Sequence, residues 1–200
     1  MTVTGTATLD VSPDCADLTM TVASEEAKPG LATQSAQAKE QAVIAALEKA
    51  GVAEKDLKLS TLQLYPVYDN TNQVIRGYHA AITVTATTRD FNQIASLMDI
   101  GANAGASQLT SNFRRSDMDA LKQKVRDMAI AAAKAKAAQT AKDLDIPLGR
   151  VISVNERTGG EMWGNAYFPQ NNSARTGGIG GELQSLTLDV TIGYELVKET

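Results

Sequence analysis

Few residues in this chain have the chemistry of a catalytic or metal-binding site. Its 200 residues include one histidine, His79, and one cysteine, Cys15. A zinc site that needs several Cys and His ligands is therefore excluded, and so are an internal disulfide and a C-x-x-C redox pair. The chain also has no G-x-S-x-G motif of the kind that forms a nucleophile elbow. The residues alone indicate no catalytic residue, no metal and no cofactor.

His79 and Cys15 each have a structural interpretation that we prefer to a chemical one. His79 falls on the polar face of an alternating strand, where an imidazole is solvated or hydrogen-bonded. Cys15 stands at the start of a strand, and no Lys, Arg or His lies beside it in sequence to lower its pKa. We rank last a direct antioxidant reaction at Cys15 or at a methionine such as Met162, because a lone thiol has no resolving partner.

The charge and hydropathy patterns exclude two broad classes of function. The net charge is -4 and no sustained basic stripe is present, which argues against a general nucleic-acid binder. The apolar runs are shorter than the roughly 18 residues that suggest a transmembrane helix. The glycine run at 177–181 follows a long irregular segment and precedes a strand. Phosphate-binding loops instead open a helix, so this run does not predict one.

The segment 158–182 has no periodicity and is the one stretch for which we predict a functional role. Structureless loops longer than about 15 residues are usually functional or disordered. Glycine and asparagine are abundant in it. Four large side chains lie among them and predict a contact surface: Met162, Trp163, Tyr167 and Phe168. The alternative is a mobile insertion whose tryptophan packs locally.

The elements that would position these residues alternate between strands and helices. The clearest strand runs from Gly77 to Thr88, with apolar and polar residues alternating. A turn at 69–72 precedes it, and the alternation of the strand at 57–68 slips near Ser60. Helical patterns occur at 31–50, from 91 to about 100, and at 116–144. The sequence therefore predicts an α+β fold of mostly antiparallel sheets with three main helices, in the order β-β-α-β-β-α-β-α-β-β, with long central and C-terminal strands.

The strand patterns also suggest how the elements associate. We expect the first two strands to form an antiparallel pair, and the last strand, Leu186 to Leu196, to pair with the strand at 77–88. This predicts a main sheet with the first helix from residues 1–88 and 183–200, a second α/β subdomain from 89–157, and the loop at 158–182. The longest helix has an expected apolar face and, beside it, a ridge of alanines that would let another element approach closely. The face comprises Leu121, Val125, Met128, Ala132 and Ala135, and the ridge Ala129, Ala133, Ala137 and Ala141.

Short motifs recur in a fixed order along almost the whole chain. They are Val3-Thr4-Gly5, Pro13-Asp14-x-Ala16, Leu47 to Gly51 with Glu54 to Leu57, Pro66-x-Tyr68, Gly77-Tyr78, and the alanine-rich helix around Ala129–Ala141 with Gly149 beyond it. In this order they resemble the bacterial SIMPL-domain proteins (domain of unknown function 541). Members usually have Thr where Leu59 stands, and they usually begin with a signal peptide.

The resemblance implies an α+β fold, export to the periplasm, a link to oxidative-stress defence and, in some members, large ring-like or channel-like homo-oligomers. It implies no catalytic residues. The printed chain begins without a signal peptide, which we expect to have been removed.

We therefore expect a non-enzymatic, self-assembling protein of the cell envelope that supports tolerance of oxidative or general stress. Its expected location is the periplasm, or it is associated with the outer membrane. Its expected partner is itself, through a strand edge, the alanine ridge or the 158–182 loop, and possibly another envelope protein. The alternative is a binding module that captures a partner protein or a small ligand through the 158–182 loop.

Overall fold

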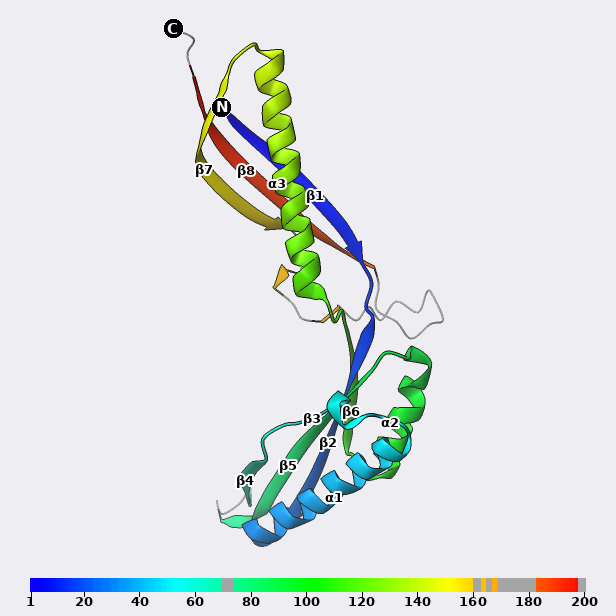
Figure 1. Cartoon of the computed structure of the whole chain (residues 1–200). Helices are drawn as coiled ribbons and strands as arrows, with labels where there is room; N and C mark the ends of the chain where they lie inside the picture. Colours follow the sequence, from blue (N-terminus) through cyan, green and yellow to red (C-terminus); the bar gives the residue numbers. More distant parts are fainter. Residues whose placement is uncertain (70–73, 160–162, 165–166, 169–182, 198–200) are drawn as a thin grey trace. The chain divides into compact units, whose positions relative to one another are not determined.

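The computed structural model describes residues 1–69, 74–159, 163–164, 167–168 and 183–197. These residues form two compact units, which Figure 1 shows with the chain coloured from blue to red. Unit 1 contains residues 1–13, 115–168 and 183–197 of the described part, and unit 2 contains residues 14–114. Antiparallel sheets and three α-helices in the described part confirm the predicted α+β class.

Unit 1 is a three-stranded antiparallel sheet with one long helix on it. The strands β1 (Thr2–Val11), β8 (Gln184–Leu196) and β7 (Leu148–Gly159) pair in the order β1-β8-β7. The helix α3 (Met118–Asp143) packs against β1 and β8 (Figure 1). Alternate side chains of β1 and β8 are buried beneath it, and the other face is rich in threonine. The buried set comprises Val3, Ala7, Val11, Leu186, Leu188, Val190 and Ile192.

Small side chains let α3 approach β1 closely. Gly5 lies in the middle of β1, and a Cβ atom on it would overlap the backbone of Ala129 and Ala133. The alanine ridge of α3 is accordingly the buried side of the helix, together with Met118 and Val125. The prediction that Met128, Ala132 and Ala135 belong to the buried face is wrong, since all three are exposed. The large side chains in this interface come from β8, whereas α3 contributes mainly the methyl groups of its alanines.

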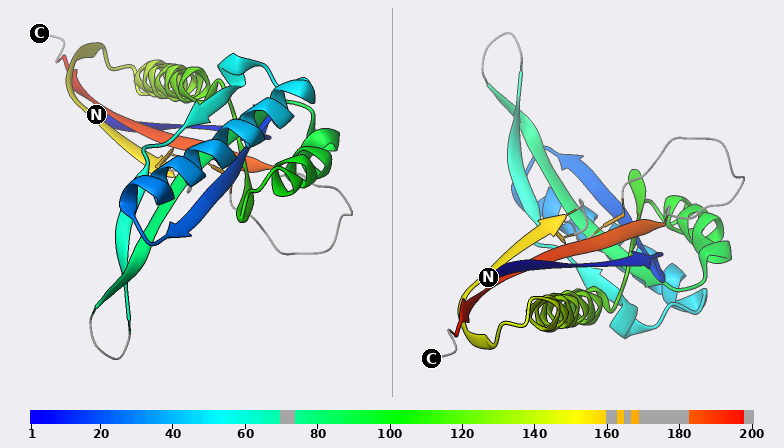
Figure 2. Two further views of the ribbon diagram at one scale, coloured as in Figure 1. Left: turned by 90° about the horizontal axis from the view of Figure 1, so that it is seen from below. Right: turned by 90° about the horizontal axis from the view of Figure 1, so that it is seen from above.

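Unit 2 is a five-stranded antiparallel sheet with two helices. The strands pair in the order β3-β5-β2-β6, and β4 also pairs with β5. Their bounds are β2 Cys15–Glu26, β3 Leu57–Leu59, β4 Gln63–Tyr68, β5 Ile75–Thr88 and β6 Gln108–Arg114. The helix α1 (Pro29–Lys49) packs on β2 and β5, as Figure 2 shows, and α2 (Ile94–Asn103) packs beside it. Two short 3₁₀ helices, Glu54–Asp56 and Phe91–Gln93, precede β3 and α2.

Local hydrogen bonds fix two helix ends of unit 2. Gly51 has a φ of 98° and takes the position after the C-cap of α1. Its N–H donates to the carbonyl of Glu48, and the N–H of Val52 donates to the carbonyl of Leu47, which is a Schellman motif. Asp90 accepts a hydrogen bond from the N–H of Asn92 at 3.0 Å and so caps the helical turn before α2.

The strand pairing differs from the prediction made from the sequence. β1 does not pair with β2, and β8 does not pair with β5. Instead β1 pairs with β8 in unit 1, and β2 pairs with β5 and β6 in unit 2. The two units also differ from the division expected at 1–88 with 183–200 and 89–157. The physical reason is that an alternating pattern fixes which face of a strand is buried and not which strand lies beside it.

The break in alternation near Ser60 is explained by an interruption between two strands. β3 and β4 both pair with β5, and residues 60–62 between them lie outside the ladder. Of the segment predicted as a 158–182 loop, the first two residues belong to β7, and most of the rest lies outside the described residues. No helix in the described part is both long and apolar enough to cross a membrane.

Candidate functional site

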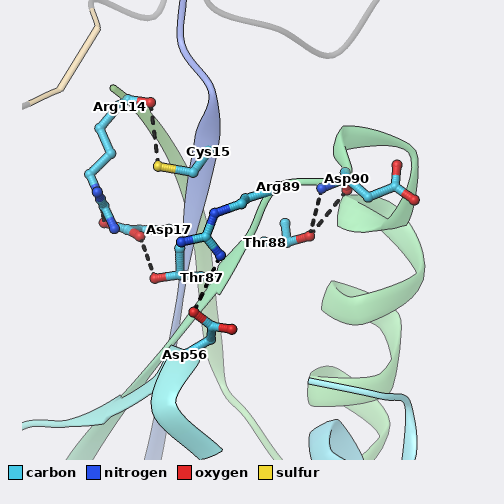
Figure 3. Close-up of polar contacts among 8 residues, drawn as sticks. All are labelled: Cys15, Asp17, Asp56, Thr87, Thr88, Arg89, Asp90 and Arg114. Carbon is cyan, nitrogen blue, oxygen red and sulfur yellow. Dashed lines mark hydrogen bonds and ion pairs between the residues drawn. The ribbon is translucent and has the colours of Figure 1, made fainter. Parts of the chain in front are cut away.

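A buried carboxylate joins three strands at one end of the sheet in unit 2. Asp17 on β2 is only 6% exposed. The hydroxyl of Thr87 on β5 donates to its Oδ1 at 2.7 Å, and Nε of Arg114 on β6 donates to its Oδ2 at 2.7 Å (Figure 3). A buried carboxylate needs such partners to offset its lost hydration. This cluster ties β5, β2 and β6 together, and its role is structural.

Cys15 lies beside this cluster and is buried. Its Sγ donates to the backbone carbonyl of Arg114 at 3.5 Å (Figure 3). Burial raises the pKa of the Cys15 thiol from 9.0 to about 11, and the positive charge of Arg114 opposes this only in part. The thiolate is the reactive form, and at neutral pH almost none of it forms here. The structure therefore gives Cys15 no property of a redox centre.

The polar residues that follow β5 also have structural partners. Arg89 forms an exposed ion pair with Asp56 at 3.5 Å, and Thr88 exchanges hydrogen bonds with the backbone of Asp90 (Figure 3). Among the residues that the structure describes, no three His, Cys, Asp or Glu side chains gather so as to hold a metal ion.

The four residues predicted to form a contact surface do not form one exposed group. Met162 lies outside the described residues. The indole N–H of Trp163 donates to the carbonyl of Thr187 at 2.8 Å, and Nζ of Lys122 binds the carbonyl of Trp163. Phe168 is buried, whereas Tyr167 is exposed. Trp163 is thus hydrogen-bonded within unit 1 and Phe168 is buried, and a contact role for the segment stays a prediction.

One edge of the unit 1 sheet, which has no strand partner among the described residues, carries a cluster of exposed apolar side chains. β7 is the outer strand of the order β1-β8-β7, and all of its residues from Val151 to Thr158 are exposed. Val151, Ile152 and Val154 are 49%, 62% and 59% exposed. The sequence signal for this edge was the run Val-Ile-Ser-Val, which does not alternate as a strand with one buried face does.

A polar groove lies on the sheet of unit 2, and His79 is part of it. The described residues that line it come from β2, β4, β5, β6 and the turn before β6: Thr21, Ala23, Gln63, Tyr65, His79, Ala81, Thr83, Ser107 and Gln108. The ring of Tyr65 stacks on that of His79, with centroids 4.8 Å apart. The alternation of the strand correctly placed His79 on the polar face but gave no sign of the groove. The turn predicted at 69–72 was the available signal, because it brings Tyr65 opposite His79 across the hairpin.

Comparison with known proteins gives a consistent family. The chain is 34% identical over 155 residues to the uncharacterized protein YggE of Escherichia coli, a match that covers 75% of this chain and 62% of the relative. It is 28% identical over 163 residues to the 26 kDa periplasmic immunogenic protein of Brucella melitensis, covering 77% and 65%. A YggE protein of Edwardsiella ictaluri is 27% identical over 154 residues, covering 75% and 64%.

These relatives are longer than the matched region. The chain spans about 62–65% of their length. None of the three is named for an enzymatic activity, and one is named for a periplasmic location. A family model described as a protein of unknown function (DUF541), SIMPL, matches residues 1–194. The resemblance seen in the sequence motifs is thereby confirmed, and the chain belongs to the SIMPL family.

Proposed function

We propose that this chain is a non-enzymatic protein of the bacterial periplasm that assembles with copies of itself through β7. The observation that carries the proposal is the exposed apolar edge at Val151–Val154. β7 is 12 residues long, and one of its sides has no strand partner in the described part of the chain. A long exposed edge with apolar side chains presents unpaired backbone groups and is a template for pairing with a strand of another chain.

Charged residues flank this edge, but none lies at its centre, where a charge would discourage pairing with another strand. Arg150 forms an ion pair with Glu195, and Glu156 forms one with Arg126 on α3. Between them, Val151 to Val154 carry no charge. Addition of β7 from a second copy would pair the backbone groups and remove three apolar side chains from water. A symmetric pair of this kind uses the same residues on both subunits.

The structure leaves fewer candidate interfaces than the sequence did. The alanine ridge is buried against β1 within unit 1, so it is not available to another subunit. Trp163 is hydrogen-bonded to β8 in the same unit, and Phe168 is buried. The strand edges remain, and among them β7 carries the exposed apolar side chains Val151, Ile152 and Val154.

The test is the solution mass by light scattering on a sizing column. We expect the intact chain to be an oligomer, and Ile152→Lys with Val154→Lys to shift it to a smaller species, because two charges would be buried in the interface. Val74→Lys is the matched control, since Val74 is equally exposed but lies in unit 2. A chain without residues 160–181 should still assemble. A monomeric wild type, or equal effects of the edge and control variants, would contradict the proposal.

A role in stress tolerance rests on the family resemblance and on the periplasmic relative. The buried thiol of Cys15 argues that such a role does not come from its reaction with peroxide. In a strain that lacks its own copy, the wild type and Cys15→Ala should restore survival in peroxide equally. The double edge variant should fail to restore it if assembly is the active state. If the wild type itself does not restore survival in peroxide, the proposed stress role is contradicted. The proposed assembly is then tested by the solution mass alone.

A further inference from the structure

The polar groove of unit 2 lies on the sheet face opposite α1. Met20, Val22, Ile82 and Val84 point toward the helix layer and are buried. Their neighbours along the same strands point the other way and form the floor of the groove, which is made by Thr21, Ala23, Ala81 and Thr83. The groove has a volume of about 340 Å³, within the range of small-molecule sites.

The floor of the groove is fixed by contacts within the sheet. The hydroxyls of Thr21 and Thr83 hydrogen-bond to each other at 3.1 Å, and Oγ of Ser107 donates to the carbonyl of Thr21. β2 and β5 are paired on both sides of this point, by β6 and by β4. The site therefore rests on a rigid sheet rather than on a loop, which favours binding without rearrangement.

The walls combine one aromatic surface with groups that both donate and accept hydrogen bonds. Tyr65 is 49% exposed although one face of its ring stacks on His79. Gln63 and Gln108 are exposed on opposite sides of the groove, and no side-chain hydrogen bond holds either amide among the described residues. An amide supplies two donors and an acceptor, and a hydroxyl supplies one donor and two acceptor sites.

We infer that this groove binds a neutral saccharide. A sugar ring has an apolar C–H face that can lie against an aromatic ring, and hydroxyls around its edge that both donate and accept. The groove offers the same combination. None of its described lining residues is Asp, Glu, Lys or Arg. A charged ligand would lose hydration there without gaining a charged partner, so a neutral ligand is favoured.

An extended peptide fits this groove less well than a sugar does. Peptides that bind sheets add to an unpaired edge, where backbone groups are available. Here the floor strands β2 and β5 have neighbours on both sides, so their backbone groups are already used. The ligand must therefore be recognised by side chains alone. The groove is also in a different unit from β7, so the inference does not depend on the proposed mode of assembly.

The experiment titrates the full chain with neutral tetrasaccharides and follows the ring signals of His79, the single histidine, by nuclear magnetic resonance. Cellotetraose, chitotetraose and maltotetraose are the probes. We expect saturable shifts of His79 with at least one of them. Tyr65→Ala should weaken binding about tenfold, since a tenfold change in affinity is roughly 1.4 kcal/mol and falls within the range of one aromatic stacking contact. Tyr65→Phe should bind nearly as the wild type does.

Tyr68→Ala is the matched control. Tyr68 lies on the same strand and is 54% exposed, but it does not line the groove. Its loss should leave binding unchanged, and circular dichroism should show that all variants are folded. The inference is overturned if none of the three tetrasaccharides shifts His79, or if Tyr65→Ala and Tyr68→Ala weaken binding equally. It is also overturned if an anionic sugar or a peptide binds the groove and the neutral sugars do not.

Discussion

Asp17 shows how a single buried charge can organise one end of a sheet. It lies on the central strand β2, and its two oxygens are bound from β5 and β6. A carboxylate placed among neighbouring strands is tolerated only because both partners are present. Removing its charge would weaken the ion pair with Arg114, whose side chain is 24% exposed.

We predict that Asp17→Asn lowers the free energy of unfolding by about 2 kcal/mol. This is less than the loss expected when one partner of a fully buried ion pair is removed, because Arg114 reaches water. Urea denaturation checks this. Asp10→Asn is the control, since Asp10 is exposed and accepts one hydrogen bond from Ser185. It should cost no more than about 0.5 kcal/mol. Equal losses in the two variants would show that Asp17 has no special structural role.

The thiol of Cys15 gives a prediction about pH. Burial raises its pKa to about 11 from 9.0, so the folded state holds this proton more tightly than the unfolded state does. The resulting stability is fully present below pH 9 and is lost as the pH rises toward 11. Cys15→Ala should therefore lose less stability than the wild type between pH 9 and 11. Identical pH dependence in denaturant titrations would show that the thiol ionises normally.

The same burial predicts slow alkylation. Iodoacetamide should modify Cys15 at neutral pH only in molecules that have opened, because the thiolate is scarce and the sulfur is inaccessible. Adding urea to the unfolding midpoint should accelerate the reaction strongly. A thiol that reacts in the native protein as fast as a free cysteine would instead support the antioxidant alternative.

At the scale of elements, the close packing of α3 on β1 depends on small residues. The helix buries alanines, and the strand places Gly5 against the backbone of Ala129 and Ala133. We predict that Gly5→Ala lowers the free energy of unfolding by about 3 kcal/mol, because the added methyl group meets backbone that cannot move aside cheaply. Thermal unfolding followed by circular dichroism measures it.

Gly30→Ala is the matched control for Gly5→Ala. Gly30 lies in the first turn of α1, and a Cβ atom there would have nothing within 4 Å. Alanine should be neutral or stabilise the protein by about 0.5 kcal/mol, because it has less freedom to lose on folding. If Gly5→Ala is tolerated as well as Gly30→Ala, the close approach of α3 and β1 is not required for stability.

At the scale of the whole molecule, the sequence predicted the elements better than their partners. The alternation from Tyr78 to Ala86 and from Leu186 to Leu196 correctly indicated two long strands with one buried face. Each pattern shows only that alternate side chains of its strand are buried, so nothing in them shows that the two strands belong to different sheets. The groove was missed for a related reason. Gln108 approaches Tyr65 only through the order β4-β5-β2-β6, and that order depends on long-range pairing.

Unit 2 is inserted into the sequence of unit 1. The chain leaves unit 1 after residue 13 and re-enters it at residue 115. The two ends of unit 2 are adjacent, since the N–H of Asp14 donates to the carbonyl of Arg114 at 3.1 Å and Cys15 pairs with Arg114 in the ladder. A domain whose ends meet can be inserted into another without strain. Its core is also its own, formed by side chains of the sheet and α1 that include Leu18, Met20, Val22, Val43, Leu47 and Val84.

We therefore predict that residues 14–114, expressed alone, fold cooperatively. Circular dichroism should show helix and strand, and urea should unfold the fragment in one sigmoidal transition, because the buried apolar side chains and the Asp17 cluster lie entirely within it. The same fragment with Leu18→Asp is the unfolded reference, since a charge at that wholly buried position has no partner. A wild-type fragment that matches this reference would mean that unit 2 needs unit 1 to fold, and the two would then form one cooperative unit.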